Sequence, residues 1–324
     1  MSAITPATDV ELTAGELVAV RRAFGPAFEK CSEKDERLVA ITADLGGSVN
    51  LSGFEERHPS RYFNCGVAET NMIGMSAGFA MAGYVPYAIT FGSFLGRAMD
   101  HIRQSIGHNK LKVNVVGSHG GISNGKDGPS AHAIEDIGMF RSMPPFAIVV
   151  VADANQIRPA IQASIDYPSP VYLRLYREPT PVFYEENPPF EIGKANVLRR
   201  GSDVTLVACG PHVGYCLRWL EVWSRDVSIE LIDCHTVKPL DEELLLESAS
   251  RTGAVVTVED HYIAGGLGSA VCELLSERHP TPVQRVGLHG YAASGPYYEL
   301  LDHVGIGESG VRAGIEVVLA RKRR

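Results

Sequence analysis

Most of the chain's reactive side chains lie between positions 44 and 177. A carboxyl group, Glu69, stands at the beginning of a segment that is rich in small residues. Two aromatic residues, Phe91 and Phe94, follow it, and His119 and Asp127 lie farther along in glycine-rich segments. Aromatic rings stack well on flat heterocycles, while a carboxyl group and a histidine can hold and move protons. These residue types are those that acid–base chemistry beside a flat ligand would need.

Each of these residues also has an ordinary structural interpretation. A glutamate at the start of a helix stabilises the helix N-terminus by its charge. Two nearby phenylalanines form a core cluster in many proteins, and aspartate is common in turns. The residue types alone therefore leave a structural and a functional interpretation open at every position.

The elements that must position these residues alternate along the chain. Short apolar runs, several of them nearly continuous, predict strands that are buried on both faces of parallel sheets. The expected strands are 38–42, 113–117, 146–151, 171–175, 204–208, 229–233, 255–259 and 283–286. The expected helices are 15–30, 69–82, 97–109, 155–165, 242–250 and 268–278. This alternation predicts an α/β fold.

A proline-rich segment divides the chain. Prolines are dense within 178–189, where they can continue neither a helix nor a central strand. We therefore expect a domain boundary here, with one domain at 1–186 and a second at 187–324. Each domain is long enough for its own mainly parallel sheet flanked by helices.

The composition argues against several classes of function. The 324 residues carry a formal net charge of −8, and no basic stripe of the kind that binds nucleic acid is visible before 321–324. The six cysteines are scattered without a Cys-x-x-Cys pair, and the first residues do not resemble a signal peptide, so we expect a cytoplasmic protein. No apolar run approaches the roughly 20 residues of a membrane helix.

Two further patterns bear on ligands. A glycine-rich turn at 265–268 lies between an expected strand and an expected helix, but it does not match the G-x-G-x-x-G fingerprint. We interpret it as a tightly packed turn rather than a phosphate loop. The His-Glu-x-x-His zinc pattern is absent, and we expect no metal ligands on this chain.

The order of the motifs resembles that of the transketolase family. The resemblance depends on Gly-Val-Ala-Glu at 66–69, the aromatic segment at 91–94 and Asp-Gly-Pro at 127–129. It continues with Thr-Val-Lys-Pro-Leu at 236–240 and with 258–268, so that it covers nearly the whole chain. It implies a pyrimidine-binding domain followed by a C-terminal domain, and thiamine diphosphate as the cofactor.

The resemblance also implies a role for individual residues. Glu69 would hydrogen-bond the pyrimidine ring of the cofactor and so promote loss of a proton from its reactive carbon. Phe91 and Phe94 would line the pyrimidine pocket, with Asp44 nearby, and His119 would act on the substrate beside the cofactor. The substrate-binding set that it implies consists of Arg21, Ser48, His119, Asp127 and Arg177.

Three of these residues, Arg21, Ser48 and Arg177, match positions that bind the substrate phosphate, for which arginine is well suited. A surface ion pair is the alternative interpretation for each arginine. Two positions depart from the family pattern. Arg97 stands where single-chain enzymes have an aromatic residue, and Ala131 stands where the family often has a histidine, so the effect of both on specificity is open.

The family's preceding domain binds the diphosphate through Mg²⁺, and the Gly-Asp-Gly motif that supplies its ligands is absent from this sequence. The resemblance therefore implies a separately encoded N-terminal subunit that supplies the Mg²⁺ ligands, an α2β2 heterotetramer, and activity only with that partner. The expected reaction transfers a two-carbon ketol unit from a ketose phosphate to an aldose.

Other functions remain open at this point. The chain could be the β subunit of a 2-oxoacid dehydrogenase or decarboxylating carboligase, half of a deoxyxylulose-phosphate synthase, or a non-catalytic assembly subunit. The sequence names neither the donor nor the acceptor, nor the pathway.

Overall fold

The computed structural model describes residues 17–223 and 226–322. Its strands are β1 Leu17–Ala19, β2 Leu38–Thr42, β3 Tyr62–Asn64, β4 Val85–Phe91, β5 Asn114–Ser118, β6 Ala147–Val150, β7 Val171–Arg174, β8 Pro179–Pro181, β9 Asn196–Arg199, β10 Val204–Ala208, β11 Ile229–Asp233, β12 Thr236–Lys238, β13 Val255–Tyr262 and β14 Val283–Leu288.

The α-helices are α1 Val20–Ser32, α2 Ser52–Arg57, α3 Glu69–Met81, α4 Met99–His101, α5 Asp136–Arg141, α6 Ile157–Ile165, α7 His212–Trp223, α8 Glu242–Thr252, α9 Leu267–Arg278, α10 Tyr297–His303 and α11 Glu308–Lys322. Short 3₁₀ turns include η1 Gly46–Val49, η3 Gly92–Ala98 and η5 Gly125–Asp127, and η4 Ile102–His108 is a π-helix. Among the described helices, none has the combination of length and apolar composition needed to cross a membrane.

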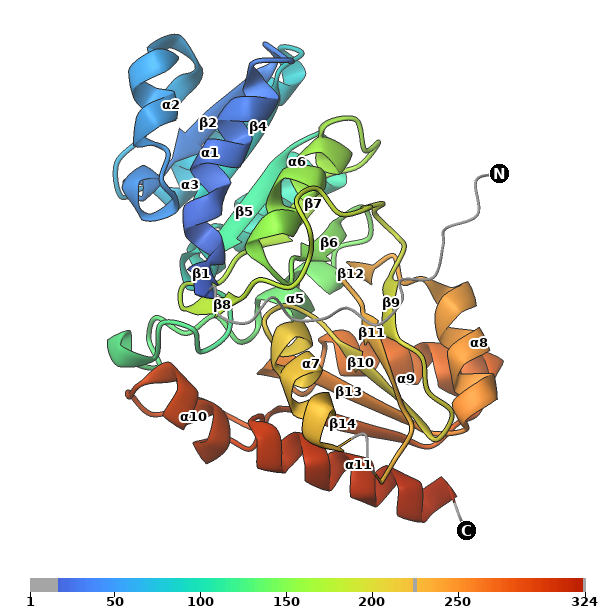
Figure 1. Ribbon diagram of the computed structural model, residues 1–324. Helices are drawn as coiled ribbons and strands as arrows, with labels where there is room; N and C mark the ends of the chain where they lie inside the picture. The colour runs from blue at the N-terminus through green and yellow to red at the C-terminus, as the bar shows by residue number, and fades with distance from the viewer. Residues whose placement is uncertain (1–16, 224–225, 323–324) are drawn as a thin grey trace.

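Two sheets organise the molecule (Figure 1). One has seven strands in the order β12-β6-β7-β5-β4-β2-β3, and the other has five in the order β14-β13-β10-β11-β9. All pairs are parallel except those made by β12 and β9, which lie at sheet edges. The short strands β1 and β8 form a separate antiparallel pair. The predicted α/β fold with mainly parallel sheets is confirmed.

The central strand β4 was not among the expected strands. It contains Pro86, and proline argues against a central strand because it donates no ladder hydrogen bond. In the structure Pro86 pairs only with β2, and the pairing with β5 begins at Tyr87. The proline therefore stands at the end of the strand, where its missing donor leaves the β5 ladder intact.

The expected helices at 15–30 and 97–109 differ from the observed elements. Residues 17–19 form β1 and α1 begins at Val20, while positions 15 and 16 lie outside the described residues. The second segment divides into the end of η3, the single turn α4 and the π-helix η4.

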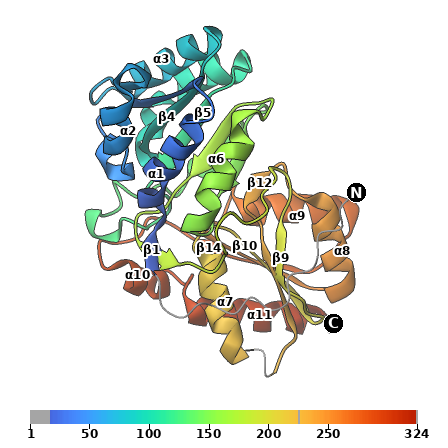
Figure 2. The same cartoon turned by 45° about the horizontal axis from the view of Figure 1, so that its top comes forward.

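The two halves of the chain share a core. The strand β12 belongs to the second half in sequence, yet it pairs with β6 at the edge of the seven-stranded sheet. One hydrophobic cluster contains Ile41 and Ala88 of the first sheet together with Ile232 and Leu267 of the second half. Figure 2 shows α10 beneath the first half, where Gly295 donates to the carbonyl of Gly125. The boundary at 186/187 stays a prediction, and the packing across it is continuous.

The glycine-rich turn at 265–268 packs on an internal carboxylate. The backbone N–H groups of Leu267 and Gly268 donate to Glu259 at 2.7 and 2.8 Å. A Cβ atom at Gly266 would lie 1.9 Å from the same carboxylate, so only glycine fits there. Burial raises the pKa of Glu259 to about 7, although the two N–H donors act in the opposite direction. The start of α9 therefore binds a side chain of the protein itself, in agreement with the packing interpretation.

A fully buried ion pair stands where the two halves meet. Arg174, at the end of β7, donates to Asp136 at 2.7 and 2.9 Å, and neither side chain is exposed. The same guanidinium donates to the backbone carbonyls of Ala133 and Asp260, at 2.7 and 3.1 Å. Arg174 thus joins a loop of the first half to β13 of the second.

Replacing Arg174 with methionine is expected to lower the free energy of unfolding by about 3–5 kcal/mol, because Asp136 would keep a buried charge without a partner. A urea titration followed by circular dichroism measures the loss. The control is Arg278→Met, whose partner Glu242 is 58% exposed and whose loss should stay below about 1 kcal/mol. Similar small losses for both variants would contradict this account of the interface.

Candidate functional site

Phe91, the last residue of β4, forms a column of side chains with Phe94 and Arg97 of η3. A 3₁₀-helix has about three residues per turn, so positions three apart lie on one face. Phe91, Phe94 and Arg97 have this spacing. The rings of Phe91 and Phe94 stack with centroids 5.2 Å apart, and the Arg97 guanidinium lies 4.7 Å from the centroid of the Phe94 ring. The column therefore presents aromatic faces with a cation at one end.

The cation at that end contacts Glu69. This glutamate is the first residue of α3 and is 5% exposed. The Arg97 guanidinium donates to its Oε1 atom at 3.0 Å. The structure thus brings Glu69 to the aromatic residues through Arg97, the position at which the sequence departs from the family pattern.

His119 stands at the other end of the column. Its imidazole stacks on Phe91 with centroids 3.7 Å apart, and its Nδ1 atom lies 3.0 Å from the hydroxyl of Ser118. Its backbone is left-handed, with φ at 60°. Stacking and backbone conformation together fix the direction of the ring.

Gly120 and Gly121, which follow His119, allow the backbone to approach the buried side chains of Arg174 and Asp260 closely. A Cβ atom at Gly120 would lie 2.7 Å from the Arg174 guanidinium, and one at Gly121 would lie 2.1 Å from the carboxyl group of Asp260. The Asp260 carboxylate also accepts from the backbone N–H of Ile122 at 3.0 Å. Arg174 and Asp260 therefore support the loop of residues 119–122, which contains His119.

The surroundings of His119 favour a neutral imidazole. Burial, and to a smaller extent the positive charges of Arg21 and Arg177, lowers the pKa of His119 to about 3. A neutral imidazole has one donor and one acceptor nitrogen, so it can exchange a proton with a substrate hydroxyl. The same electrostatic effect indicates that both arginines lie close enough to His119 for their charges to act on it.

We expect the His119 imidazole to stay neutral from about pH 8 to about pH 5, whereas an unperturbed histidine gains its proton near pH 6.5. A pH titration of ¹³C-labelled histidine followed by NMR tests this, with the His119 signal assigned from a His119→Gln variant. The same signal after unfolding in urea is the control and should titrate normally. An inflection of the folded-state signal within this pH range would contradict the expectation.

The polar residues that are expected to bind the substrate also lie close together, and several of them contact one another. The Arg177 guanidinium donates to the carboxylate of Asp127 in an ion pair. Arg21 donates to the backbone carbonyl of Ser48 rather than to its hydroxyl. Arg177 also lowers the pKa of Arg21, after the larger effects of burial and of Arg22. Arg21 and Arg177 therefore form one positive group beyond His119.

Among the described residues, Asp44 forms hydrogen bonds with Asn64 and not with the residues of this column. Its backbone N–H donates to the side chain of Asn64 at 3.0 Å, and its carboxylate accepts from the same amide at 3.1 Å. Asp44 has a left-handed backbone with φ at 61°, which aspartate tolerates better than most residues. Within the described part of the chain, Asp44 makes no hydrogen bond with Glu69.

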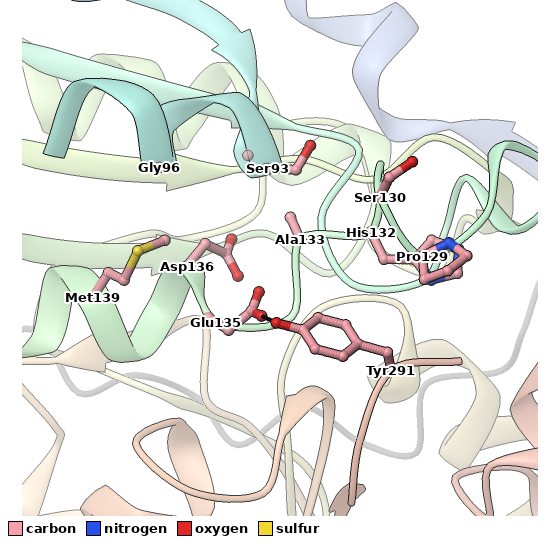
Figure 3. A pocket seen from close by; sticks show the side chains of 11 residues that line it. Ser93, Gly96, Pro129, Ser130, His132, Ala133, Glu135, Asp136, Met139 and Tyr291 are labelled. Carbon is pink, nitrogen blue, oxygen red and sulfur yellow. Dashed lines mark hydrogen bonds between the residues drawn. The ribbon is translucent and has the colours of Figure 1, made fainter. Parts of the chain in front are cut away.

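A cavity of about 590 Å³ opens on another face of η3 (Figure 3). It is lined by Ser93 and Gly96 of η3, by residues 129, 130, 132, 133, 135 and 136, and by Tyr291 of the second half. The hydroxyl of Tyr291 donates to Glu135 at 2.5 Å. Within the described chain, the ring nitrogens of the buried His132 make no hydrogen bond. Sequence reasoning did not select His132 as a site residue, although the replacement at the preceding Ala131 drew attention to this loop.

Across residues 17–223 and 226–322, no three His, Cys, Asp or Glu side chains gather as a metal-binding group would. The candidate site of this α/β protein thus consists of a buried carboxylate, stacked rings, a neutral histidine and two arginines that follow one another.

Comparison with known proteins identifies the family. The family model for the transketolase pyrimidine-binding domain matches residues 16–182, and the model for the transketolase C-terminal domain matches residues 193–311. The chain therefore belongs to the transketolase family, which confirms the predicted family.

Individual relatives agree. The 6-deoxy-6-sulfo-D-fructose transketolase subunit SqwH of Clostridium sp. (strain MSTE9) is 39% identical over 259 residues, which cover 79% of this chain and 80% of that protein. An apulose-4-phosphate transketolase subunit of Phocaeicola vulgatus is 32% identical over 302 residues, which cover 92% of this chain and 96% of that protein. A solved split gene transketolase, described as an inactive β4 tetramer, is 38% identical with a TM-score of 0.86 and covers 94% of this chain and 99% of that one.

Proposed function

We propose that this chain is one subunit of a two-component transketolase, and that it acts on sugars with a terminal anionic group, a phosphate in the first instance. The observation that carries the proposal is the continuous arrangement from the buried Glu69, through the stacked rings, to His119 and the two arginines. The relatives named above are subunits of transketolases and similar in length to this chain, which supports a two-chain enzyme.

Membership of the family implies thiamine diphosphate as the cofactor, and the groups found here fit its pyrimidine half. Glu69 offers a buried carboxyl group to a ring nitrogen, and the face of Phe94 that lies beside Glu69 suits a flat heterocycle. We place the Mg²⁺ ligands and the diphosphate contacts on the partner subunit, because the Gly-Asp-Gly motif is absent from this sequence.

When bound, thiamine diphosphate supplies the carbon nucleophile that takes up the two-carbon unit. In the proposed mechanism Glu69 holds a proton at the pyrimidine nitrogen, and Phe91 and Phe94 orient the ring. His119, kept neutral by burial, accepts a proton from a substrate hydroxyl and returns it.

The remaining site residues bind the rest of the substrate. Asp127 accepts from the hydroxyl next to the reacting carbonyl, and Arg21 and Arg177 hold the terminal anion, with Ser48 beside Arg21. In this proposal Asp44 stays near the cofactor without contacting the ring.

The assembly proposed with this function is an α2β2 heterotetramer, in which the partner completes the active site. A cytoplasmic location is proposed as well, because all six cysteines carry free thiols.

Co-expression with the neighbouring reading frame, followed by a screen of ketose phosphates with thiamine diphosphate and Mg²⁺, tests the function. We expect transfer from a ketose phosphate to an aldose only when both subunits are present. Transfer from pyruvate, with none from any ketose phosphate, would replace this function with that of a 2-oxoacid-dependent enzyme. Turnover by this chain without a partner would contradict the two-component assignment.

A further inference from the structure

The side chain of Arg97 contacts both Glu69 and Phe94, the two residues that a bound pyrimidine would need. Its guanidinium donates to Glu69 Oε1 at 3.0 Å, and its central carbon lies 4.7 Å from the Phe94 ring centroid. A pyrimidine that hydrogen-bonds Glu69 and stacks on Phe94 requires the same acceptor and the same aromatic surface.

The Phe94 ring has a second neighbour besides Arg97. Phe91 stacks on Phe94 with centroids 5.2 Å apart and an interplanar angle of 25°, and His119 stacks in turn on Phe91. Phe94 and Arg97 lie on one face of η3 because they are three residues apart, and Phe91 precedes η3 as the last residue of β4. A flat ligand that stacks on Phe94 therefore competes with the Arg97 guanidinium for the surface of this ring.

Glu69 cannot serve both partners in the same way. Its carboxylate accepts a charge-assisted hydrogen bond from Arg97, and this partner has to leave before the carboxyl group can share a proton with a ring nitrogen. Glu69 is 5% exposed with Arg97 in place, so loss of this partner in the free subunit would leave an inward-lying charge unpaired, which is unfavourable. Arg97 itself is 60% exposed, so its side chain can turn into solvent without rearranging the core.

We propose that Arg97 is an internal, displaceable occupant of the pyrimidine site. It pairs with Glu69 and covers Phe94 while the site is empty, and it moves into solvent when the cofactor binds. This inference rests on the proposed function and adds to it a residue that controls cofactor affinity. It also gives a physical reason for an arginine at a position where single-chain enzymes have an aromatic wall.

The test is the affinity of the reconstituted two-subunit enzyme for thiamine diphosphate, measured by isothermal titration calorimetry with Mg²⁺ present. Arg97→Met removes the competing contacts and keeps an apolar stem over Phe94, so we expect binding to become about 5- to 30-fold tighter. The matched control is Arg103→Met, which removes an arginine of similar exposure that pairs with Asp100 instead. The control should change the affinity less than about twofold.

A crystal structure of the wild-type complex with thiamine diphosphate gives a second, independent result. We expect the distance from Arg97 to Glu69 to exceed the 4.0 Å limit of an ion pair, and this structure decides the question if Arg97→Met does not fold. Unchanged or weaker binding by Arg97→Met, or an ion pair retained beside the bound cofactor, would overturn the proposal. If neither the wild-type complex nor the variant binds thiamine diphosphate, the proposed function fails, and this inference with it.

Discussion

Replacing Glu69 with glutamine is expected to lower kcat of the reconstituted enzyme about 100- to 10,000-fold, the range over which a positioned acid–base group contributes. Glutamine has nearly the same shape, so α3 and its packing should persist. It still fills the site, but it cannot hold an acidic proton at the pyrimidine nitrogen. Steady-state kinetics with a saturating ketose phosphate measures the effect.

A matched control separates this role from the ordinary benefit of an acid at a helix start. Glu242 lies in the first turn of α8 and is 58% exposed. Glu242→Gln loses a comparable interaction with the helix dipole, worth about 0.3–1 kcal/mol of stability, and should leave kcat unchanged. Undiminished turnover by Glu69→Gln would leave only the structural interpretation of Glu69, and the chain would then be an assembly subunit.

Replacing Arg177 with methionine is expected to raise KM for a phosphorylated sugar about 10- to 100-fold and to leave KM for the unphosphorylated form almost unchanged. A hydrogen bond between charged groups contributes about 1.5–3 kcal/mol, and losing one in the bound state accounts for this range. Paired KM measurements on a sugar with and without its phosphate test the prediction.

The contact between Arg177 and Asp127 makes a further variant informative. Asp127→Asn alters the hydroxyl contact, so it should raise KM for both forms of the sugar, and the weakened ion pair with Arg177 adds a change for the phosphorylated form only. Arg158→Met is the control, since Arg158 is 25% exposed, close to the 30% of Arg177, and pairs with Glu186 instead. Equal effects of Arg177→Met on both forms of the sugar would remove the phosphate contact from the proposed mechanism.

Strands with continuous apolar runs lie where the sequence predicts them. The bounds of β2, β10 and β11 agree residue for residue. In β2 and β10 five consecutive apolar or β-branched residues favour burial on both faces, whereas β11 also contains the buried Glu230 and Asp233. The edge strands β3, β9 and β12 were not predicted. They have three or four residues, and their pairing depends on a neighbour from a distant part of the chain.

The candidate site, like the strands, includes residues that the sequence predicted and one residue that it did not. The positions of Glu69, Phe91, Phe94 and His119 follow from the order of motifs, and the structure brings them into one column. Arg174 was missed, although a single arginine within the apolar run at 171–176 is a signal that could have identified it. A charge in such a strand is buried, and burial requires a partner.

The sequence by itself determined the alternation of strands and helices, the small residues after Glu69 and the types of side chain in the candidate site. Only the tertiary structure decided that Arg97 contacts Glu69, that Arg177 contacts Asp127 and that Arg174 supports the His119 loop. The first two contacts join residues 28 and 50 positions apart. Local sequence sets periodicity and propensity, whereas contacts at such separations exist only after the sheets have packed and placed the strand ends side by side.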